Sequence, residues 1–383
     1  MKKNTTIAVI FLVVVFQSLS LGQTVSTFIG PGINIDDALI LDAEGNIYGS
    51  HFTGSAIYKV TPEGDISIYA DGFNTPNDLA FDAEGNLYVA DNQRNAVFKI
   101  TPDSNITQFG PTITSASGLI FDRHSDTLLV TQYLSNRIIK LAPDGSTRNY
   151  ITGFGLDGPV GLAYDDNDTL YVGNYNDGQI FKIVNDRPQR IAIVPGTNFG
   201  AIGFLAYIAG DLYATAIGRH RIYKITLDGV MTEFAGTGSP GLEDGPASTA
   251  RFTNPNGIIA SASGNEILIS DFGTKSIRVI SDIVTGIEPE NVSEIPISLR
   301  LEQNFPNPFN PSTEIRFSLP EAQNVELAVY DIRGSKIVTL VKSQLAAGVY
   351  RMPFNASGLS SGVYIYQLIS GEFVDRKKMV LMQ

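Results

Sequence analysis

The sequence predicts an all-β protein: a six-bladed β-propeller followed by a small C-terminal β-sandwich. One short strand pattern, of the type IYKV, recurs six times, at residues 57–60, 97–100, 138–141, 180–183, 222–225 and 277–280. Successive copies begin 40, 41, 42, 42 and 55 residues apart, a period typical of a closed or stacked array of β units. After residue 299 the pattern changes to longer alternating strands, which indicates a second domain.

Each repeat predicts one blade, and the second repeat shows the order of its parts most clearly. It contains the apolar string LAF at 79–81, an acidic turn at 82–86, the strand LYVA at 87–90, the strand VFKI at 97–100 and a further turn. Gly, Asn, Asp and Pro fill the turns because they tolerate positive φ or preset φ. This order predicts four short antiparallel strands per unit, as in a propeller blade.

The sixth copy of the pattern is not followed by a turn and a fourth strand. Residues 25–29 resemble the fourth strands ITQF at 106–109 and MTEF at 231–234. We therefore expect the N-terminal strand to complete the sixth blade. Joining the two ends of the chain in one sheet would leave no unpaired edge in the ring.

The N-terminus reads as a secretory signal peptide, residues 1–22. Two lysines precede the apolar run 7–16, and Ser20, Leu21 and Gly22 offer a cleavage site. The run is too short for a membrane span, so no transmembrane span is expected after cleavage. The chain has no cysteine, which excludes a lipoprotein anchor, disulfides, thiol catalysis and thiolate metal sites.

The charge is unevenly distributed between the two predicted domains. The net charge is −12, yet residues 300–383 contain nine Lys or Arg and seven Asp or Glu, so the propeller carries the whole acidic excess. An acidic surface repels phosphate groups, which argues against nucleic acid and anionic membranes as partners.

Residues 285–299 lose the propeller pattern and are predicted to be a linker to a separate domain at 300–383. That domain contains QNFPNPFNP at 303–311, YD at 330–331 with Gly334, AGVY at 347–350, SGVY at 361–364 and KKMVL at 377–381. The motifs resemble the type A C-terminal sorting domain of type IX secretion substrates. The resemblance implies recognition by the type IX machinery of a Gram-negative Bacteroidetes-type cell, and a secreted or outer cell-surface location. An adhesive sandwich domain is the alternative.

The propeller, residues 23–284, resembles NHL-repeat propellers. The similarity lies in GLIFD at 118–122 with NRI at 136–138, and in DAEGNLYVAD at 82–91. Residues 236–257 resemble the extended loop between blades of secreted NHL propellers, which explains the longer last spacing. These are motifs of the fold and do not themselves imply an activity.

Alignment of the repeats predicts a ring of residues at the start of the innermost strands: Asp37, Asn77, Ser117, Val160, Gly203 and Asn256. Asp37, Asn77 and Asn256 belong to neighbouring blades and are oxygen donors, so they predict a site for Ca²⁺ or another divalent metal, with Asp36 and Asp78 adding charge. The alternative is that such side chains cap strands and bind backbone donors.

The predicted metal residues are similar to motifs of a known family of propellers. The Pro-Asn motifs at 76–77 and 255–256 resemble those of gluconolactonase-type propellers, which implies a metal that polarises a lactone carbonyl. The first blade lacks the Glu-Gly-Pro motif of that family, so Asp37 would have to replace its ligating Glu.

A second ring lies at the end of the second strands: His51, Asp91, Gln132, Asn174, Ala216 and Asp271. His51, Asp91, Asn174 and Asp271 are predicted to contact a ligand, although the usual role of this position is to bind loop backbone within its own blade. The three histidines, His51, His124 and His220, occupy different repeat positions, which disfavours a histidine zinc centre.

Two functions of different classes remain open, and we assign no catalytic residue. The leading hypothesis is a secreted or cell-surface binding module for an unidentified small-molecule or surface ligand. The alternative is a divalent-metal-dependent lactonase of gluconolactonase type, so whether the protein is an enzyme stays open. A lyase lacks the expected arrangement of His and Glu, and no nucleophile elbow, phosphate loop or zincin helix is present.

Overall fold

The computed structural model describes residues 23–261, 266–281, 283, 288–289, 296–345, 347–356 and 359–382. The predicted signal peptide lies outside the described residues. The regular elements are strands, apart from two short 3-10 helices, η1 (Tyr133–Ser135) and η2 (Ile217–Arg219). Within the described ranges, no helix has the length and hydropathy needed to cross a membrane.

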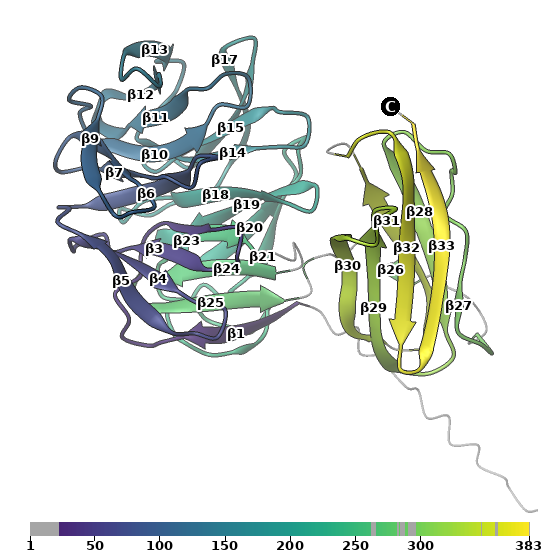
Figure 1. The fold of residues 1–383 in the computed structure, drawn as a ribbon. Helices are drawn as coiled ribbons and strands as arrows, with labels where there is room; N and C mark the ends of the chain where they lie inside the picture. The colour runs from purple at the N-terminus through teal and green to yellow at the C-terminus, as the bar shows by residue number, and fades with distance from the viewer. Residues whose placement is uncertain are drawn as a thin grey trace, which may run out of the picture.

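Each of the first five blades is a four-stranded antiparallel sheet of consecutive strands (Figure 1). The first two are β2 (Leu39–Leu41), β3 (Ile47–Ser50), β4 (Ala56–Val60), β5 (Ile66–Asp71) and β6 (Pro76–Phe81), β7 (Leu87–Asp91), β8 (Ala96–Ile100), β9 (Ile106–Phe109). The third is β10 (Ala116–Phe121), β11 (Leu128–Gln132), β12 (Arg137–Leu141) and β13 (Thr147–Thr152). The fourth is β14 (Pro159–Tyr164), β15 (Leu170–Asn174), β16 (Gln179–Val184) and β17 (Arg187–Ile193), and the fifth is β18 (Ile202–Ile208), β19 (Asp211–Ala216), β20 (Arg221–Ile225) and β21 (Met231–Ala235).

The sixth blade joins both ends of the propeller chain, which confirms the predicted closure. Its strands are, in spatial order, β22 (Gly245–Pro246), β1 (Thr24–Ile29), β25 (Ser276–Ser281), β24 (Glu266–Asp271) and β23 (Pro255–Ala260). β1 pairs antiparallel with β25, with Val25 opposite Ile280. The innermost strands contact one another in sequence order around the ring, and β2 contacts β23.

The register of the innermost strands agrees with the alignment of the repeats. In blades two to six, the first residue of this strand pairs with the last residue of the second strand, and the register then shifts. The pairs are Pro76–Asp91, Ala116–Gln132, Pro159–Asn174, Ile202–Ala216 and Pro255–Asp271. We call this end of the propeller the loop face, and the end with the acidic turns at 42–46 and 82–86 the turn face.

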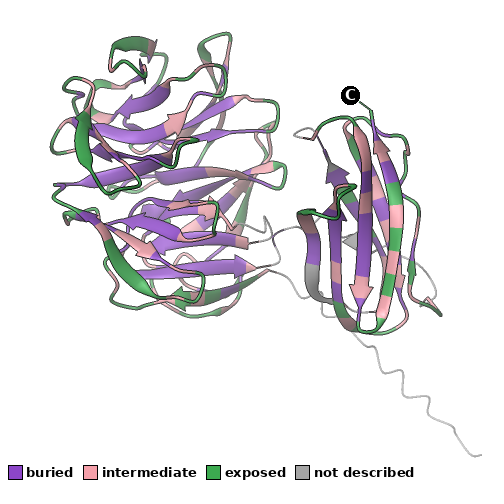
Figure 2. Cartoon of the chain, in the orientation of Figure 1, coloured by how far each residue is buried: buried purple, intermediate pink, exposed green. Residues whose placement is uncertain are grey.

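The recurring IYK string has a structural explanation on the turn face. In blade one, Tyr48 Oη donates to Asp42 Oδ2 at 3.2 Å, and Lys59 Nζ lies 5.3 Å from the centre of the Tyr48 ring. In blade two, Lys99 Nζ likewise lies 5.3 Å from the centre of the Tyr88 ring. The flanking apolar residues of these strands are buried (Figure 2). The alternation therefore buries one face of each strand and fastens the other to its turn.

The C-terminal domain consists of two four-stranded sheets with their own core. One contains β26 (Glu288–Pro289), β31 (Gly348–Asn355), β28 (Ser312–Leu319) and β27 (Arg300–Leu301), and the other β30 (Lys336–Leu345), β29 (Gln323–Tyr330), β32 (Gly362–Ser370) and β33 (Phe373–Leu381). β26 comes from the predicted linker and pairs with β31, so the sandwich begins before residue 300.

The QNFPNPF motif fastens the edge of this sandwich. The backbone N–H of Asn304 donates to Tyr366 Oη at 2.7 Å, and Asn304 Nδ2 donates to Thr313 Oγ1 at 2.9 Å. Phe309 is buried in the core. The motif therefore contributes to packing as well as carrying the family resemblance.

Candidate functional site

Two of the three predicted metal residues meet at the axis of the loop face. Asn256 Nδ2 donates to Asp37 Oδ1 at 2.7 Å, between blades six and one. Both side chains are buried. Asn77 is buried at the corresponding position of blade two.

The two carboxylate oxygens of Asp37 differ in their hydrogen bonding. Asp37 Oδ2 is buried and accepts no hydrogen bond from the part of the chain that the structure describes. Burial raises the pKa of Asp37 well above its ordinary range, and the Asp36 and Asp78 carboxylates raise it further. The Asn256 amide and the Lys275 ammonium act in the opposite direction. A buried acceptor without a donor is costly, so this oxygen marks a candidate binding point.

Neighbouring blades are joined near the axis by hydroxyl groups of the second strands. Ser270 Oγ donates to the carbonyl oxygen of Asp37 at 2.5 Å and accepts the N–H of Gly257 at 2.8 Å. Thr215 Oγ1 donates to the carbonyl oxygen of Asn256 at 2.6 Å. These hydroxyls connect blade six to blade one and blade five to blade six.

Blade two has Ala90 at the hydroxyl position, and Asp78 makes the connection instead. Asp78 Oδ1 accepts the N–H of Leu79 at 2.8 Å, and Oδ2 accepts the N–H of Leu119, in blade three, at 2.7 Å. Burial raises the pKa of Asp78 to about 7, although the two backbone donors lower it. Asp78 thus joins two blades, and both of its oxygens are already hydrogen-bonded.

The predicted metal site fits a divalent ion only in part. Among the described residues, no three His, Asp or Glu side chains gather closely enough to hold a metal ion. Asp37 Oδ2 is a suitable oxygen ligand for such an ion. The amide nitrogen of Asn256 faces Asp37, so this amide would have to rotate to present its oxygen to an ion beside that carboxylate.

Three of the four predicted ligand-contact residues are hydrogen-bonded to backbone in their own blades. Asp91 accepts the N–H groups of Asn74 at 2.8 Å, Thr75 at 3.1 Å and Arg94 at 3.1 Å. Asn174 Nδ2 donates to the carbonyl oxygen of Gly155 at 2.9 Å, and both oxygens of Asp271 accept the N–H of Thr253, at 3.0 and 2.8 Å. All three side chains are buried, which fits the structural role of this ring; ligand contact by them stays a prediction.

His51 is the fourth predicted ligand-contact residue. It lies near Asp36 and Lys275, at the seam of blades one and six. Its Nε2 is 3.7 Å from Asp36 Oδ2. Asp36 Oδ1 accepts the N–H of Phe52 at 2.9 Å, and Asp36 Oδ2 pairs with the ammonium of Lys275. Lys275 Nζ also lies 4.2 Å from the centre of the Phe272 ring.

The histidines have separate surroundings, as the sequence predicts. His124 Nε2 lies 3.1 Å from the carbonyl oxygen of Asp168, on the turn face. His220 Nδ1 accepts the N–H of Asn254 at 3.1 Å, beside the extended loop. His51 has neither of these neighbours.

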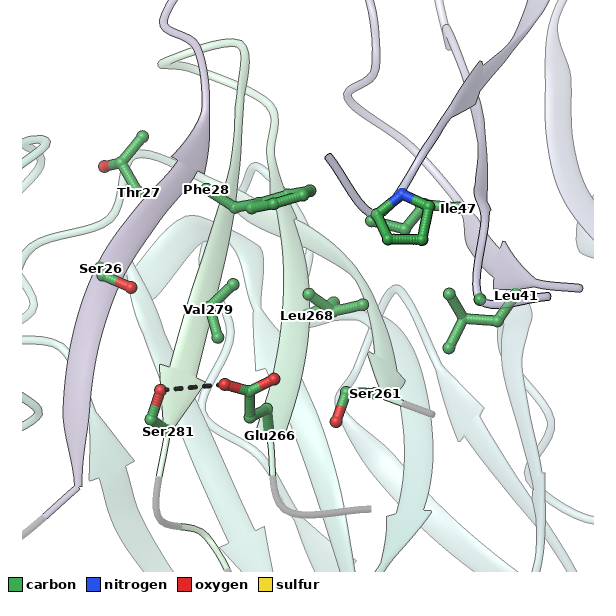
Figure 3. A pocket seen from close by; sticks show the side chains of 12 residues that line it. Ser26, Thr27, Phe28, Leu41, Ile47, Ser261, Glu266, Leu268, Val279 and Ser281 are labelled. Carbon is green, nitrogen blue, oxygen red and sulfur yellow. Dashed lines mark hydrogen bonds between the residues drawn. The ribbon is translucent and has the colours of Figure 1, made fainter. Parts of the chain in front are cut away.

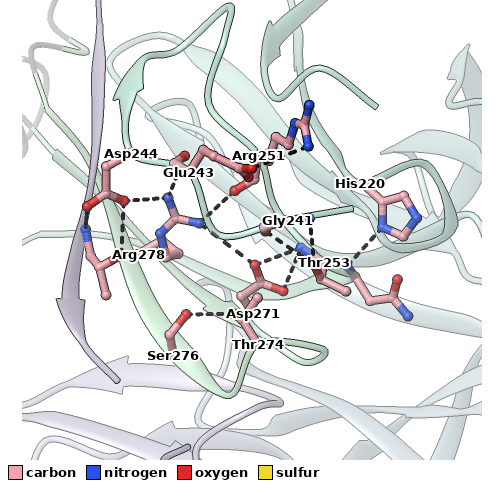
Figure 4. A network of polar contacts seen from close by, with 12 residues as sticks. His220, Gly241, Glu243, Asp244, Arg251, Thr253, Asp271, Thr274, Ser276 and Arg278 are labelled. Carbon is pink, nitrogen blue, oxygen red and sulfur yellow. Dashed lines mark hydrogen bonds and ion pairs between the residues drawn. The ribbon is translucent and has the colours of Figure 1, made fainter. Parts of the chain in front are cut away.

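Sequence reasoning missed Arg278, which organises the extended loop (Figure 4). Its side chain is fully buried, donates to Asp244 Oδ1 at 2.7 Å and to the carbonyl oxygen of Arg251 at 2.7 Å, and lies 3.9 Å from Asp271 Oδ2. Asp244 also accepts the N–H and the hydroxyl of Thr27. The sequence contained a signal for this role, because the position of Arg278 is Tyr, Phe or Ile in the other five copies of the strand pattern.

Sequence reasoning also missed an aromatic position on the loop face. The residues directly after the second ring are Phe52, Asn92, Tyr133, Tyr175, Ile217 and Phe272, four of which are aromatic. Phe52 and Phe272 form one edge-to-face pair, with ring centres 6.3 Å apart, and Tyr133 and Tyr175 form another at 5.8 Å. The repeat alignment contained this signal.

A cavity of about 420 Å³ lies on the turn face, at the seam where blades six and one meet (Figure 3). Its walls include Phe28, Leu41 and Leu268, and Ser281 Oγ donates to Glu266 Oε1 at 3.4 Å at one end. It lies at the opposite end of the propeller from Asp37 and shares no residue with the predicted site.

The fold and the two domains define the protein as a six-bladed β-propeller that carries a secretion tail. The model of the virginiamycin B lyase family matches residues 32–240, and the chain belongs to that family. The model of the secretion system C-terminal sorting domain matches residues 303–382, which confirms the predicted sorting domain. The protein is therefore a secreted or cell-surface protein of the Bacteroidetes type.

Solved structures with the same fold include a binding protein, a hydrolase and a lyase. An auxiliary nutrient binding protein from Bacteroides ovatus is 15% identical over 68% of this chain and 77% of its own, with a TM-score of 0.60. A gluconolactonase from Xanthomonas campestris is 16% identical over 68% and 90%, with a TM-score of 0.55. Virginiamycin B lyase from Staphylococcus aureus is 15% identical over 68% and 99%, with a TM-score of 0.51. At these identities the likeness establishes the fold alone, and no curated protein matches the sequence.

Proposed function

We propose that the propeller is a binding module, displayed on the cell surface or released, that takes its ligand on the loop face around Asp37. The observation that carries the proposal is the buried Asp37 Oδ2, which lacks a hydrogen-bond donor within the described residues. A ligand that donates to this oxygen would remove the cost of its burial. An auxiliary nutrient binding protein has the same fold, which supports a binding role.

The sorting domain supplies the route to the ligand. Type IX machinery would recognise residues 300–383 and carry the propeller across the outer membrane, after signal-peptide cleavage at residue 22. The compactness of the sandwich, with its own core around Phe317 and Tyr366, supports a separate recognition unit. The loop face would then meet extracellular small molecules or surface polymers.

A ligand screen with matched variants tests the binding proposal. Small molecules and soluble polysaccharides are screened against the purified protein by thermal shift, and hits are titrated by calorimetry. We expect Asp37→Asn to weaken a hit by about tenfold or more, because the amide presents a donor group to a site that needs an acceptor. The control Glu63→Gln, on the exposed turn face, should leave the affinity unchanged. Hits that depend on Glu63 and not on Asp37 would refute the loop-face site.

A second candidate function is a divalent-metal-dependent lactone hydrolase. It is favoured by the same oxygen, since Asp37 Oδ2, with Asn77 and Asn256, would hold the ion. When bound, a divalent metal polarises a carbonyl oxygen and favours attack by water. The residues of this chain would hold the ion and orient the lactone beside it.

Elemental analysis of the purified protein before and after chelation tests the hydrolase. The hydrolase predicts a stoichiometric metal that is lost in Asp37→Ala and Asn256→Ala, together with lactone hydrolysis that disappears in the same variants. Glu63→Gln should keep both. A metal-free protein whose melting temperature ignores chelator would contradict the hydrolase and leave the binding module.

A further inference from the structure

We propose that Tyr133 and Tyr175 on the loop face, with the carboxylate of Asp157 beside them, bind an organic cation, such as a quaternary or protonated amine with apolar substituents. The inference rests on the proposed loop-face binding and names the chemical class of its ligand. The aromatic faces would contact the substituents, and the Asp157 carboxylate would balance the charge.

The two rings are held in place by the scaffold. Tyr133 and Tyr175 meet edge to face, with ring centres 5.8 Å apart and planes at 77°. Tyr175 Oη donates to the carbonyl oxygen of Phe199 at 2.8 Å, and Tyr133 Oη donates to Asn176 Oδ1 at 2.8 Å. Both hydroxyls are engaged in hydrogen bonds, and both tyrosines are only half-buried, so part of each side chain stays exposed.

Glycines of the loops between blades make room for each ring. A Cβ at Gly200 would overlap the Tyr175 ring, and a Cβ at Gly158 would come within 2.6 Å of the Tyr133 ring. Both glycines have positive φ, +102° and +59°, so the local backbone favours glycine as well. The rings therefore lie directly against main chain, a rigid arrangement that reduces the entropy lost on binding.

One carboxylate, that of Asp157, lies beside the tyrosine pair. Asn176 Nδ2 donates to Asp157 Oδ1 at 2.8 Å, which links this carboxylate to Tyr133 through the same amide. Burial and then the Asp157 carboxylate raise the pKa of Tyr133. Burial, Tyr133 and the Asp37 carboxylate, in that order, raise the pKa of Tyr175.

The tyrosine pair has no cation of its own among the described residues. Eight other aromatic rings carry a Lys or Arg within 4.2 to 5.9 Å of the ring centre, including Phe272 with Lys275. Tyr133 is instead linked to the Asp157 carboxylate through Asn176. With a net charge of −12, the chain as a whole also attracts cations.

Choline and its neutral isostere 3,3-dimethylbutan-1-ol test the inference. Each is titrated into the purified full chain, with binding followed by ligand-observed NMR. We expect choline to bind at least about tenfold more tightly than the neutral isostere. Tyr175→Leu should weaken choline about tenfold, whereas Tyr175→Phe, which keeps the ring, should stay within about twofold of the original affinity. Asp157→Asn should weaken choline several-fold without affecting the isostere, and melting temperatures verify that each variant is folded.

Two results would overturn the inference. One is equal affinity, or no measurable affinity, for choline and the isostere. The other is choline binding that Tyr175→Leu leaves unchanged, since the cation would then lie elsewhere. After either result, the proposed binding function still stands if Asp37→Asn abolishes the binding of a neutral ligand found in the screen. The proposed function fails separately, if substitutions on the loop face change the affinity of no ligand, charged or neutral.

Discussion

At the residue scale, the loop-face carboxylates differ in how many backbone donors they accept. Asp91 accepts three N–H groups and Asp78 accepts two, whereas Asp37 accepts one side-chain amide. Residues of one type at neighbouring repeat positions therefore have different roles. Asp78 and Asp91 hold blades and loops, whereas Asp37 Oδ2 has no hydrogen-bond donor among the described residues.

The buried Asp78 predicts a pH dependence of stability. Burial raises the pKa of Asp78 and that of Asp271 to about 7, above the ordinary value of 3.8, so the folded state binds these protons more tightly than the unfolded state. The free energy of unfolding should thus be highest near pH 4 and fall as the pH rises to about 7, by at most about 4 kcal/mol per group. Above pH 7 these two groups add no further change.

Urea unfolding between pH 5 and pH 8 checks this dependence. Asp78→Asn should lower the overall stability, because an amide cannot accept both N–H groups, and should also make the loss of stability with pH less steep. Glu63→Gln, an exposed carboxyl on the turn face, should keep the original slope. An Asp78→Asn slope equal to that of the unchanged protein would argue against the raised pKa.

At the element scale, the sixth blade is the point where the ring depends on contacts between distant segments. β1 supplies its outer strand, and Asp244 of the extended loop holds both Thr27 of β1 and Arg278 of β25. The loop thereby ties together the two ends of the propeller chain. The other blades are formed by consecutive strands and need no such connection.

Replacing Arg278 tests the connection. Arg278→Met should lower the free energy of unfolding by roughly 3–5 kcal/mol, because Asp271 would lose its buried cationic neighbour and two carbonyl groups would lose a donor. The control Arg251→Met removes an exposed ion pair with Glu243 and should cost less than about 1 kcal/mol. Denaturant unfolding compares the two, and similar losses would show that Arg278 does not hold the seam.

At the scale of the whole molecule, the propeller and the sandwich each have a hydrophobic core of their own. The sandwich core around Phe317, Leu327 and Tyr366 contains no propeller residue. The acidic excess lies in the propeller, while the sorting domain is slightly basic. Each unit can therefore be expected to fold independently.

Deleting residues 301–383 should separate export from folding. We expect the truncated chain to remain in the periplasm while its propeller melts cooperatively near the temperature of the full chain, because the propeller core stays complete. Cell fractionation and thermal unfolding measure the two properties. A substitution of the exposed Ile332 in the sandwich serves as a control that should fold and be exported. Efficient export of the truncation would contradict the role of the sorting domain.

The sequence by itself determined the number of blades, the closing strand and the sorting domain. These features follow from local alternation, turn residues and a constant repeat length, all of which are visible along the chain. The sequence also located the ring that contains Asp37 and Asn256, since equivalent positions in a closed array point to the same axis.

Only the tertiary structure decided which of these side chains have hydrogen-bond partners among the described residues. The hydrogen bond from the Leu119 N–H to Asp78 joins two blades, and so does the ring contact of Tyr133 with Tyr175. The close approach of Gly200 to the Tyr175 ring joins a loop between blades to blade four. Repeat position alone does not predict such pairings, because each depends on how neighbouring blades are rotated and packed. Hydrogen-bond satisfaction is a property of the packed molecule, and it distinguishes the structural carboxylates from Asp37.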